Sequence, residues 1–294
     1  MRLIRKWRDK QYKVNNYLYQ NGDGFKVFHT INKNTLDTYI SLVIKGGTYY
    51  EKEISVPNGT AHFLEHMLAK PNKYFKTQEE IDIFEFGTRD KPEIRFNATT
   101  SYKYMHIFSW GNSTRELDYL YRIFTCVDYP TEQFKKFIKN EKKIIISELH
   151  RKLLPEKDPD YNYYKFVLNN ELWNNDIYTL GESDEIINSI EAHHLEAFYK
   201  HIFTINNCML SIQSPNKLSD DMVDMINKLS SILKKNGSSN NDKPESFTKK
   251  YYEGYYYYQG QRGTDIELTK FDADNRQKPL DYKKLALQDF SGSL

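Results

Sequence analysis

The sequence lacks the features that mark several broad classes of protein. Only two of its 294 residues are cysteines, Cys126 and Cys208, so a disulfide framework is excluded and both are expected to be reduced core residues of an intracellular protein. No apolar run approaches the length of about 20 residues that a membrane-spanning helix needs. Met1 to Lys13 contains no apolar segment of a secretory signal. We therefore expect a cytoplasmic protein without a membrane partner.

The sequence also has no large excess of positive or negative charge. The formal net charge is +2, although 28% of the residues are charged. Such a balance describes a charged surface without a strong preference for anionic or cationic partners. We accordingly expect no nucleic-acid partner.

The residues of a metal site stand together in His62-Phe63-Leu64-Glu65-His66. A helix turns by about 100° per residue, so His62, Glu65 and His66 project into one arc, and the intervening apolar residues lie on the opposite side. This HxxEH order is the inverzincin signature: two imidazoles can bind zinc, and Glu65 can act as the base toward water. The alternative is an ordinary helix with two polar histidines on its surface. The pentapeptide alone does not decide between this interpretation and a metal site.

A long helix is predicted after Pro130. Thr131 is placed as its N-cap, and apolar residues repeat at helical spacing until Pro155 ends the pattern. This helix offers carboxylates for a third metal ligand.

Glu141 and Glu148 occupy the apolar phase of that helix. They are seven residues apart, a drift of only about 20°, so both should point inward with Phe134 and Ile145. A carboxylate in an interior is costly unless it is paired or bound to metal. The alternative is a pair of glutamates bordering a solvated face. We favour Glu148 as the ligand, with Glu141 holding one of the ligating imidazoles.

Further short motifs occur on both sides of these residues. In chain order the motifs are Gly46-Gly47 with Glu51, Gly59 to Met67, Phe96 to Ser101, Glu141 to Leu149, Leu180-Gly181-Glu182, and Phe198-Tyr199 to Asn206-Asn207. Together they resemble the M16 metallopeptidases, the family of pitrilysin, insulin-degrading enzyme and the mitochondrial processing peptidase, over about residues 14–234. Val56-Pro57-Asn58-Gly59 resembles the Gram-positive bacterial branch of that family.

This resemblance implies a zinc-dependent endopeptidase. One zinc ion per chain would be bound by His62, His66 and Glu148, with Glu65 as the catalytic base. It also implies that Asn97, Ala98 and Thr99 form an edge strand that pairs with an extended peptide substrate, a mode in which main-chain hydrogen bonds give affinity. For Asn97 alone, a turn or bulge is the alternative.

The predicted fold class is α+β, with an antiparallel-rich sheet covered by helices, as in one half-unit of the M16 fold. The expected organisation is a peptidase half-domain over 1–234, a linker over 235–248 and a tyrosine-rich extension over 249–294, which forms a hairpin or the stub of a second domain. The expected strands are 15–19, 25–30, 38–45, two within 94–110, and 207–213. The expected helices are 77–86, 113–129, the helix after Pro130, 159–173, 189–202 and 219–233.

Members of this family generally close a chamber with two homologous halves, and the sequence provides only one. The chain would therefore pair with a homologous subunit or with itself, be a truncated relative, or work as an open half. The rival to a peptidase is a non-catalytic or partner-dependent subunit of a peptidase complex. Relatives of that kind usually lack one of the motif residues, and here all of them are present.

Overall fold

The computed structural model describes residues 1–153, 180–181, 183–233, 255–259, 266–271 and 277–278. The chain divides into two compact units. The first comprises Met1–Leu149 and Ile177–Asn241, and the second comprises His150–Asp176 and Asp242–Leu294. Every candidate site residue named above belongs to the first unit.

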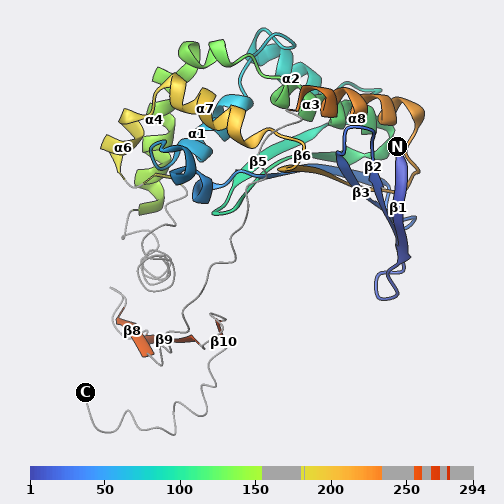
Figure 1. Cartoon of the computed structure of the whole chain (residues 1–294), viewed down its shortest axis with the longest axis horizontal. Helices are drawn as coiled ribbons and strands as arrows, with labels where there is room; N and C mark the ends of the chain where they lie inside the picture. Colours follow the sequence, from blue (N-terminus) through green and yellow to red (C-terminus); the bar gives the residue numbers. More distant parts are fainter. Residues whose placement is uncertain (154–179, 182, 234–254, 260–265, 272–276, 279–294) are drawn as a thin grey trace, which may run out of the picture. The chain divides into compact units, whose positions relative to one another are not determined.

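A seven-stranded sheet forms the base of the first unit (Figure 1). Its strands, in spatial order, are β1 (Arg2–Arg8), β2 (Asn15–Gln20), β3 (Lys26–Ile31), β7 (Cys208–Ser214), β4 (Asp37–Lys45), β6 (Tyr104–Asn112) and β5 (Arg95–Thr100). Every neighbouring pair is antiparallel except β3 and β7. The sheet therefore ends on β1 at one edge and on β5 at the other.

Helices cover one face of this sheet, as Figure 1 shows. The described α-helices are α1 (Thr60–Leu68), α2 (Gln78–Phe86), α3 (Glu116–Val127), α4 (Phe134–Leu153), α6 (Asp184–Ser189), α7 (Ala192–Ile202) and α8 (Asp220–Ile232). Short 3-10 helices lie at Thr48–Tyr50, Lys52–Ile54, Ser113–Arg115 and Thr131–Gln133. Figure 1 places α1, α4 and α6 toward one end of the unit, and α1 contacts both α7 and β5.

The core lies between the sheet and the helices. Along β4, Ile40, Leu42 and Ile44 are fully buried at alternate positions, as a strand with one covered face requires. From the helical side, Phe63 and Leu64 of α1 join the same cluster. The apolar half of the HxxEH segment thus packs into the core and holds the other half at a fixed place.

The α+β prediction is confirmed, with a seven-stranded, mostly antiparallel sheet and helices on one of its faces (Figure 1). Within this seven-stranded sheet, β1 was not predicted. All seven residues of β1 are exposed, so it lacks the apolar-polar alternation that marks a half-buried strand.

Two helix boundaries were predicted wrongly. Thr131 is not the N-cap of α4, because a 3-10 turn over Thr131–Gln133 precedes it and the helix begins at Phe134. The predicted helix 189–202 is two elements: α6 ends at Ser189, and Ile190 is extended. Glu191 then caps α7 in a reciprocal capping box with His194.

The second unit contains a three-stranded sheet in the order β10-β9-β8. Strands β8 (Tyr255–Gln259) and β9 (Ile266–Phe271) pair antiparallel, as do β9 and β10 (Gln277–Lys278). The predicted linker 235–248 and the predicted helix 159–173 lie outside the described residues. The division at residues 234 and 249 stays a prediction.

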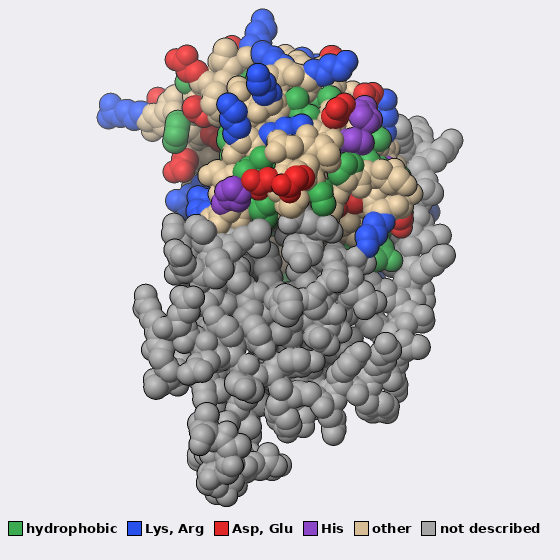
Figure 2. Space-filling model, turned by 90° about the vertical axis from the view of Figure 1, so that its left-hand side faces the viewer, with side chains coloured by type: hydrophobic (Ala, Val, Ile, Leu, Met, Phe, Trp, Pro, Cys, Tyr) green, Lys and Arg blue, Asp and Glu red, His purple; other side chains and the backbone are tan. Residues whose placement is uncertain are grey.

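The surface of the first unit mixes both signs of charge. On the face shown in Figure 2, basic and acidic side chains are interspersed, without a broad area of one sign. Within the described part of the chain, no helix combines the length and apolarity that a bilayer crossing requires.

Candidate metal centre

The start of α1 is held by a buried carboxylate. The helix has Gly59 as its N-cap, with φ of 91° and no side chain of its own to accept the first amides. Glu51, which is 1% exposed, accepts instead: Oε1 from Ala61 N at 2.7 Å and Oε2 from Gly59 N at 3.1 Å. The side chain of Asn58 donates to the same carboxylate at 3.0 Å. A negative charge at this terminus also matches the helix dipole.

Gly59 also permits a close approach by a distant segment. A Cβ at Gly59 would meet Gly181 Cα at 2.9 Å and Leu180 O at 3.0 Å. Any side chain at this position would therefore displace backbone as well as strain a positive φ. The Leu180-Gly181 motif thus packs on the beginning of the HxxEH helix.

Replacing Glu51 by glutamine is expected to destabilise the protein by about 2–4 kcal/mol, because a buried amide cannot accept from the same three donors. Urea unfolding of the two proteins measures this difference. Glu53→Gln is the matched control: Glu53 is exposed, and its replacement is expected to change stability by less than about 0.5 kcal/mol. Equal stability of Glu51→Gln and the parent would contradict this role of Glu51.

Three side chains from two helices converge next to α1. His62 and His66 come from α1 and Glu148 from α4, and their ligand atoms all lie within 4.8 Å of one another. The separations are 3.1 Å between the two Nε2 atoms, 3.6 Å from His62 Nε2 to Glu148 Oε2, and 3.5 Å from His66 Nε2 to the same oxygen. His62 is buried, while His66 and Glu148 are partly exposed.

These separations fit the ligand set of a tetrahedral zinc ion. Ligands about 2.1 Å from zinc at tetrahedral angles lie about 3.4 Å apart. Two imidazole nitrogens and a carboxylate oxygen are also donors that zinc accepts, and three protein ligands leave one coordination position open. These three residues, from two different helices, can therefore hold a metal ion.

Glu141 fixes the tautomer of one ligand. Its Oε1 lies 2.8 Å from His66 Nδ1, so that nitrogen carries the proton and the Nε2 lone pair points toward His62 and Glu148. The Lys70 ammonium lies 2.6 Å from Glu141 Oε2. Burial raises the pKa of Glu141, but hydrogen bonds from His66 and Lys70 and their charges outweigh it, and the pKa lies below its ordinary value. Glu141 is thus held ionised beside the imidazole.

Glu65 lies on the same helix as the two histidines and faces the edge strand. Its Oε2 accepts a hydrogen bond from the hydroxyl of Thr100, the last residue of β5. Glu65 is partly exposed, whereas the flanking Leu64 is fully buried. Glu65 is thus held on the same short helix as His62 and His66, in contact with the end of the edge strand.

The predicted substrate-binding residues lie on β5. Asn97 and Thr99 are exposed on one face of this strand, and Ala98 is half-buried on the other. Among the described residues, β5 pairs with β6 alone, so its second edge has no strand partner there. The Ala98 amide donates to Asn97 Oδ1 at 2.9 Å. Asn97 is therefore a strand residue and not a turn or bulge residue.

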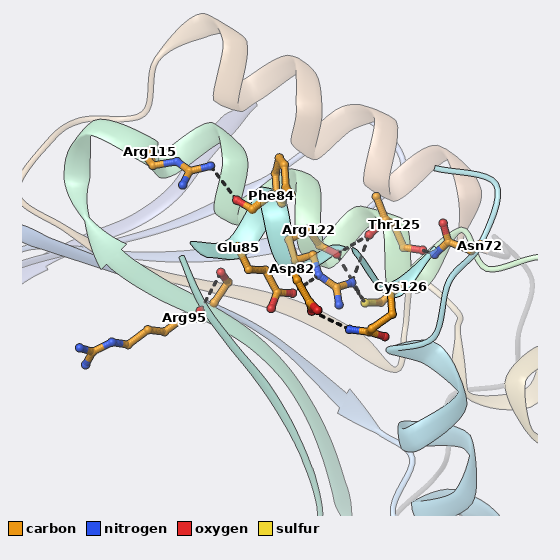
Figure 3. A network of polar contacts seen from close by, with 11 residues as sticks. Asn72, Asp82, Phe84, Glu85, Arg95, Arg115, Arg122, Thr125 and Cys126 are labelled. Carbon is orange, nitrogen blue, oxygen red and sulfur yellow. Dashed lines mark hydrogen bonds and ion pairs between the residues drawn. The ribbon is translucent and has the colours of Figure 1, made fainter. Parts of the chain in front are cut away.

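A buried arginine braces β5 from the helical side (Figure 3). The Arg122 guanidinium stacks 4.0 Å from the centre of the Phe96 ring, while its Nε lies 2.6 Å from Glu85 Oε1 of α2. Its Nη1 also contacts Thr125 and Cys126 on α3. Cation–π contact and ion pairing together tie the edge strand to two helices. Burial raises the pKa of the Cys126 thiol, and both cysteines are buried and not joined in a disulfide.

Sequence reasoning named the three converging residues and Glu65, but it missed three residues that hold them or α1 in place. Glu51 was noted only as part of a motif, and Thr100 was quoted without a role. Lys70 was not considered, although it lies four residues after His66, just past the end of α1. Alternation along β5 could have indicated that Thr100 shares a face with Ala98.

Known proteins show similarity in sequence and in fold. Residues 27–145 match the insulinase family, peptidase family M16. No curated protein matches the chain significantly. The first half of the periplasmic protease PqqL from Escherichia coli has a similar structure, with a TM-score of 0.63 and 19% identity over 81% of this chain and 49% of that one. Pitrilysin is also similar in structure, with a TM-score of 0.63 and 15% identity over 79% of this chain and 24% of the pitrilysin chain.

A third similar structure is an inactive M16 peptidase domain from Pseudomonas fluorescens, with a TM-score of 0.59 and 14% identity over 76% of this chain and 52% of that one. The chain thus spans about half the length of the first and third structures and about a quarter of pitrilysin. The matched sequence ends before Glu148, so the third ligand rests on geometry. The family match and the half-unit fold agree with the motifs, and residues 27–145 carry a domain of peptidase family M16, the insulinase family.

Proposed function

We propose that this chain is the metal-binding unit of a zinc-dependent endopeptidase. The observation that carries the proposal is the convergence of His62, His66 and Glu148, whose ligand atoms lie within 4.8 Å of one another, with the Glu65 carboxylate on the helix of the two histidines. Family membership supports the proposal, and the structural similarities add the fold.

The roles of the side chains follow from their positions. Zinc held by the three ligands would supply Lewis-acid polarisation of the scissile carbonyl and of water. Glu65 accepts a proton from that water and later gives it to the leaving amine. Glu141 keeps the His66 lone pair directed at the site.

The substrate would be a peptide in an extended conformation. Asn97, Ala98 and Thr99 stand on the edge strand whose last residue, Thr100, contacts Glu65. A peptide added along that edge would run past the base and the ligands, and its main chain would supply most of the hydrogen bonds. The Asn97 side chain would have to leave the Ala98 amide for that pairing.

Removal and return of metal test the proposal directly. The purified chain is expected to contain about one zinc ion and to cleave an internally quenched peptide library, because three protein ligands leave a position open for catalysis. Dialysis against a chelator should abolish cleavage, and one equivalent of zinc should restore it. A metal-free, folded protein without cleavage, alone or with a homologous M16 chain, would contradict the proposal.

A second candidate is a non-catalytic or partner-dependent subunit. Two observations favour it: the fold is similar to a domain described as inactive, and the chain spans only part of its structural relatives. In this case a homologous half or a second copy would complete the peptidase. Cleavage that appears only when a homologous chain is added would favour partner dependence.

A further inference from the structure

Thr100 lies where the edge strand contacts the Glu65 carboxylate. It is the last residue of β5, and alternation places it on the helix-facing side with Phe96 and Ala98. Its hydroxyl donates to Glu65 Oε2. The contact joins a strand residue to a helix residue 35 positions away in the sequence.

A carboxylate on a long side chain needs such a restraint to act as a base. The glutamate side chain has several rotatable bonds, and each of its conformations directs the two oxygens differently. Proton transfer requires an oxygen within hydrogen-bond reach of the reacting water, in a fixed direction. A hydroxyl donor on one oxygen removes much of this freedom without removing the negative charge.

We propose that Thr100 is a positioning residue that orients the Glu65 carboxylate for proton transfer. The inference rests on the proposed peptidase function and extends it to a residue outside the HxxEH motif. One consequence is that the strand proposed to bind the peptide also sets the direction of the base.

Valine and serine separate this role from simple packing. Thr100→Val keeps the shape and removes the hydroxyl, whereas Thr100→Ser keeps the hydroxyl and removes a methyl group. Thr30→Val is the matched control, because Thr30 is also a half-buried strand residue whose hydroxyl donates to a side chain, Asn16 Oδ1 at 2.7 Å. It lies on β3, outside the candidate site.

The first measurement is steady-state cleavage by the zinc-loaded full-length chain of the library peptide that the parent cleaves fastest. Thr100→Val is expected to lower kcat by about 10- to 100-fold at unchanged KM, the effect of losing one hydrogen bond to a charged group. Thr100→Ser should stay within about threefold of the parent, since the donor is retained. Thr30→Val should leave both constants unchanged.

The second measurement needs neither metal nor activity. Urea unfolding midpoints of the metal-free protein are compared for Thr100→Val, Glu65→Ala and the double variant. Residues in direct contact give non-additive effects, whereas distant ones add. We expect non-additivity for this pair and additivity for Thr30→Val with Glu65→Ala.

The outcomes distinguish this inference from the proposed function. An active parent with an equally active Thr100→Val variant overturns the inference and leaves the peptidase intact. A serine variant as impaired as the valine variant, or a change confined to KM, also overturns it. If the parent cleaves nothing, alone or with a homologous M16 chain, the proposed function fails, and additive midpoints would overturn the Thr100–Glu65 contact separately.

Discussion

Replacing Glu65 by glutamine is expected to lower kcat for peptide cleavage by about 10³-fold, because an amide cannot accept the proton that a carboxylate accepts. The zinc content should remain at about one ion per chain, since Glu65 is not among the three converging ligands. Glutamine has nearly the same shape, so the packing of α1 should persist. Cleavage and zinc are measured on the same preparation.

Glu79→Gln is the control for this substitution. Glu79 is an exposed glutamate of α2, and its replacement should leave both zinc content and cleavage unchanged. Undiminished hydrolysis by Glu65→Gln would show that another group accepts the proton. Loss of zinc together with activity would instead place Glu65 among the ligands.

Replacing Glu148 by alanine is expected to weaken zinc binding by more than about 100-fold. Removal of a residue that only supports a ligand typically weakens metal binding by 10- to 100-fold, and removal of a ligand should exceed that. Zinc affinity is measured by competition with a chromophoric chelator. This variant tests the ligand that lies outside the family match.

Substitutions of two further glutamates show whether the loss of zinc affinity is specific to Glu148. Glu141→Gln should weaken zinc binding less than Glu148→Ala, because Glu141 contacts His66 Nδ1 and not the converging atoms. Glu132→Ala should have no effect, since Glu132 is exposed in the 3-10 turn before α4. A larger loss for Glu141 than for Glu148 would reverse the two roles.

The ligands were accessible from sequence because their arrangement is mostly local. Helical phase brings His62, Glu65 and His66 onto one side, and the seven-residue spacing directs Glu141 and Glu148 alike. The cost of an interior carboxylate then favoured Glu148 as the third ligand, and the family resemblance implied the same set of residues. The structure brings ligand atoms of His62, His66 and Glu148 within 4.8 Å of one another, and their role as metal ligands stays a prediction.

The supporting contacts were inaccessible because they are tertiary. Glu51 reaches Ala61 over ten residues, and Thr100 reaches Glu65 over 35. Neither contact produces a recurring residue spacing that could be recognised in the sequence. Strand β1 was missed because its residues are exposed, and Thr131 was misplaced because a 3-10 turn and an N-cap begin with similar residues. The sequence pattern thus predicted most helices and strands and the candidate ligands, but not the tertiary contacts that hold them in place.

The central claim is that His62, His66 and Glu148 hold one zinc ion. X-ray absorption at the zinc edge of the purified, zinc-loaded chain tests it most directly, because the spectrum reports the ligand atoms themselves. We predict two imidazole nitrogens and oxygen ligands at about 2.0–2.2 Å, with no sulfur. A zinc ion bound by sulfur, or by fewer than two imidazoles, would contradict the claim.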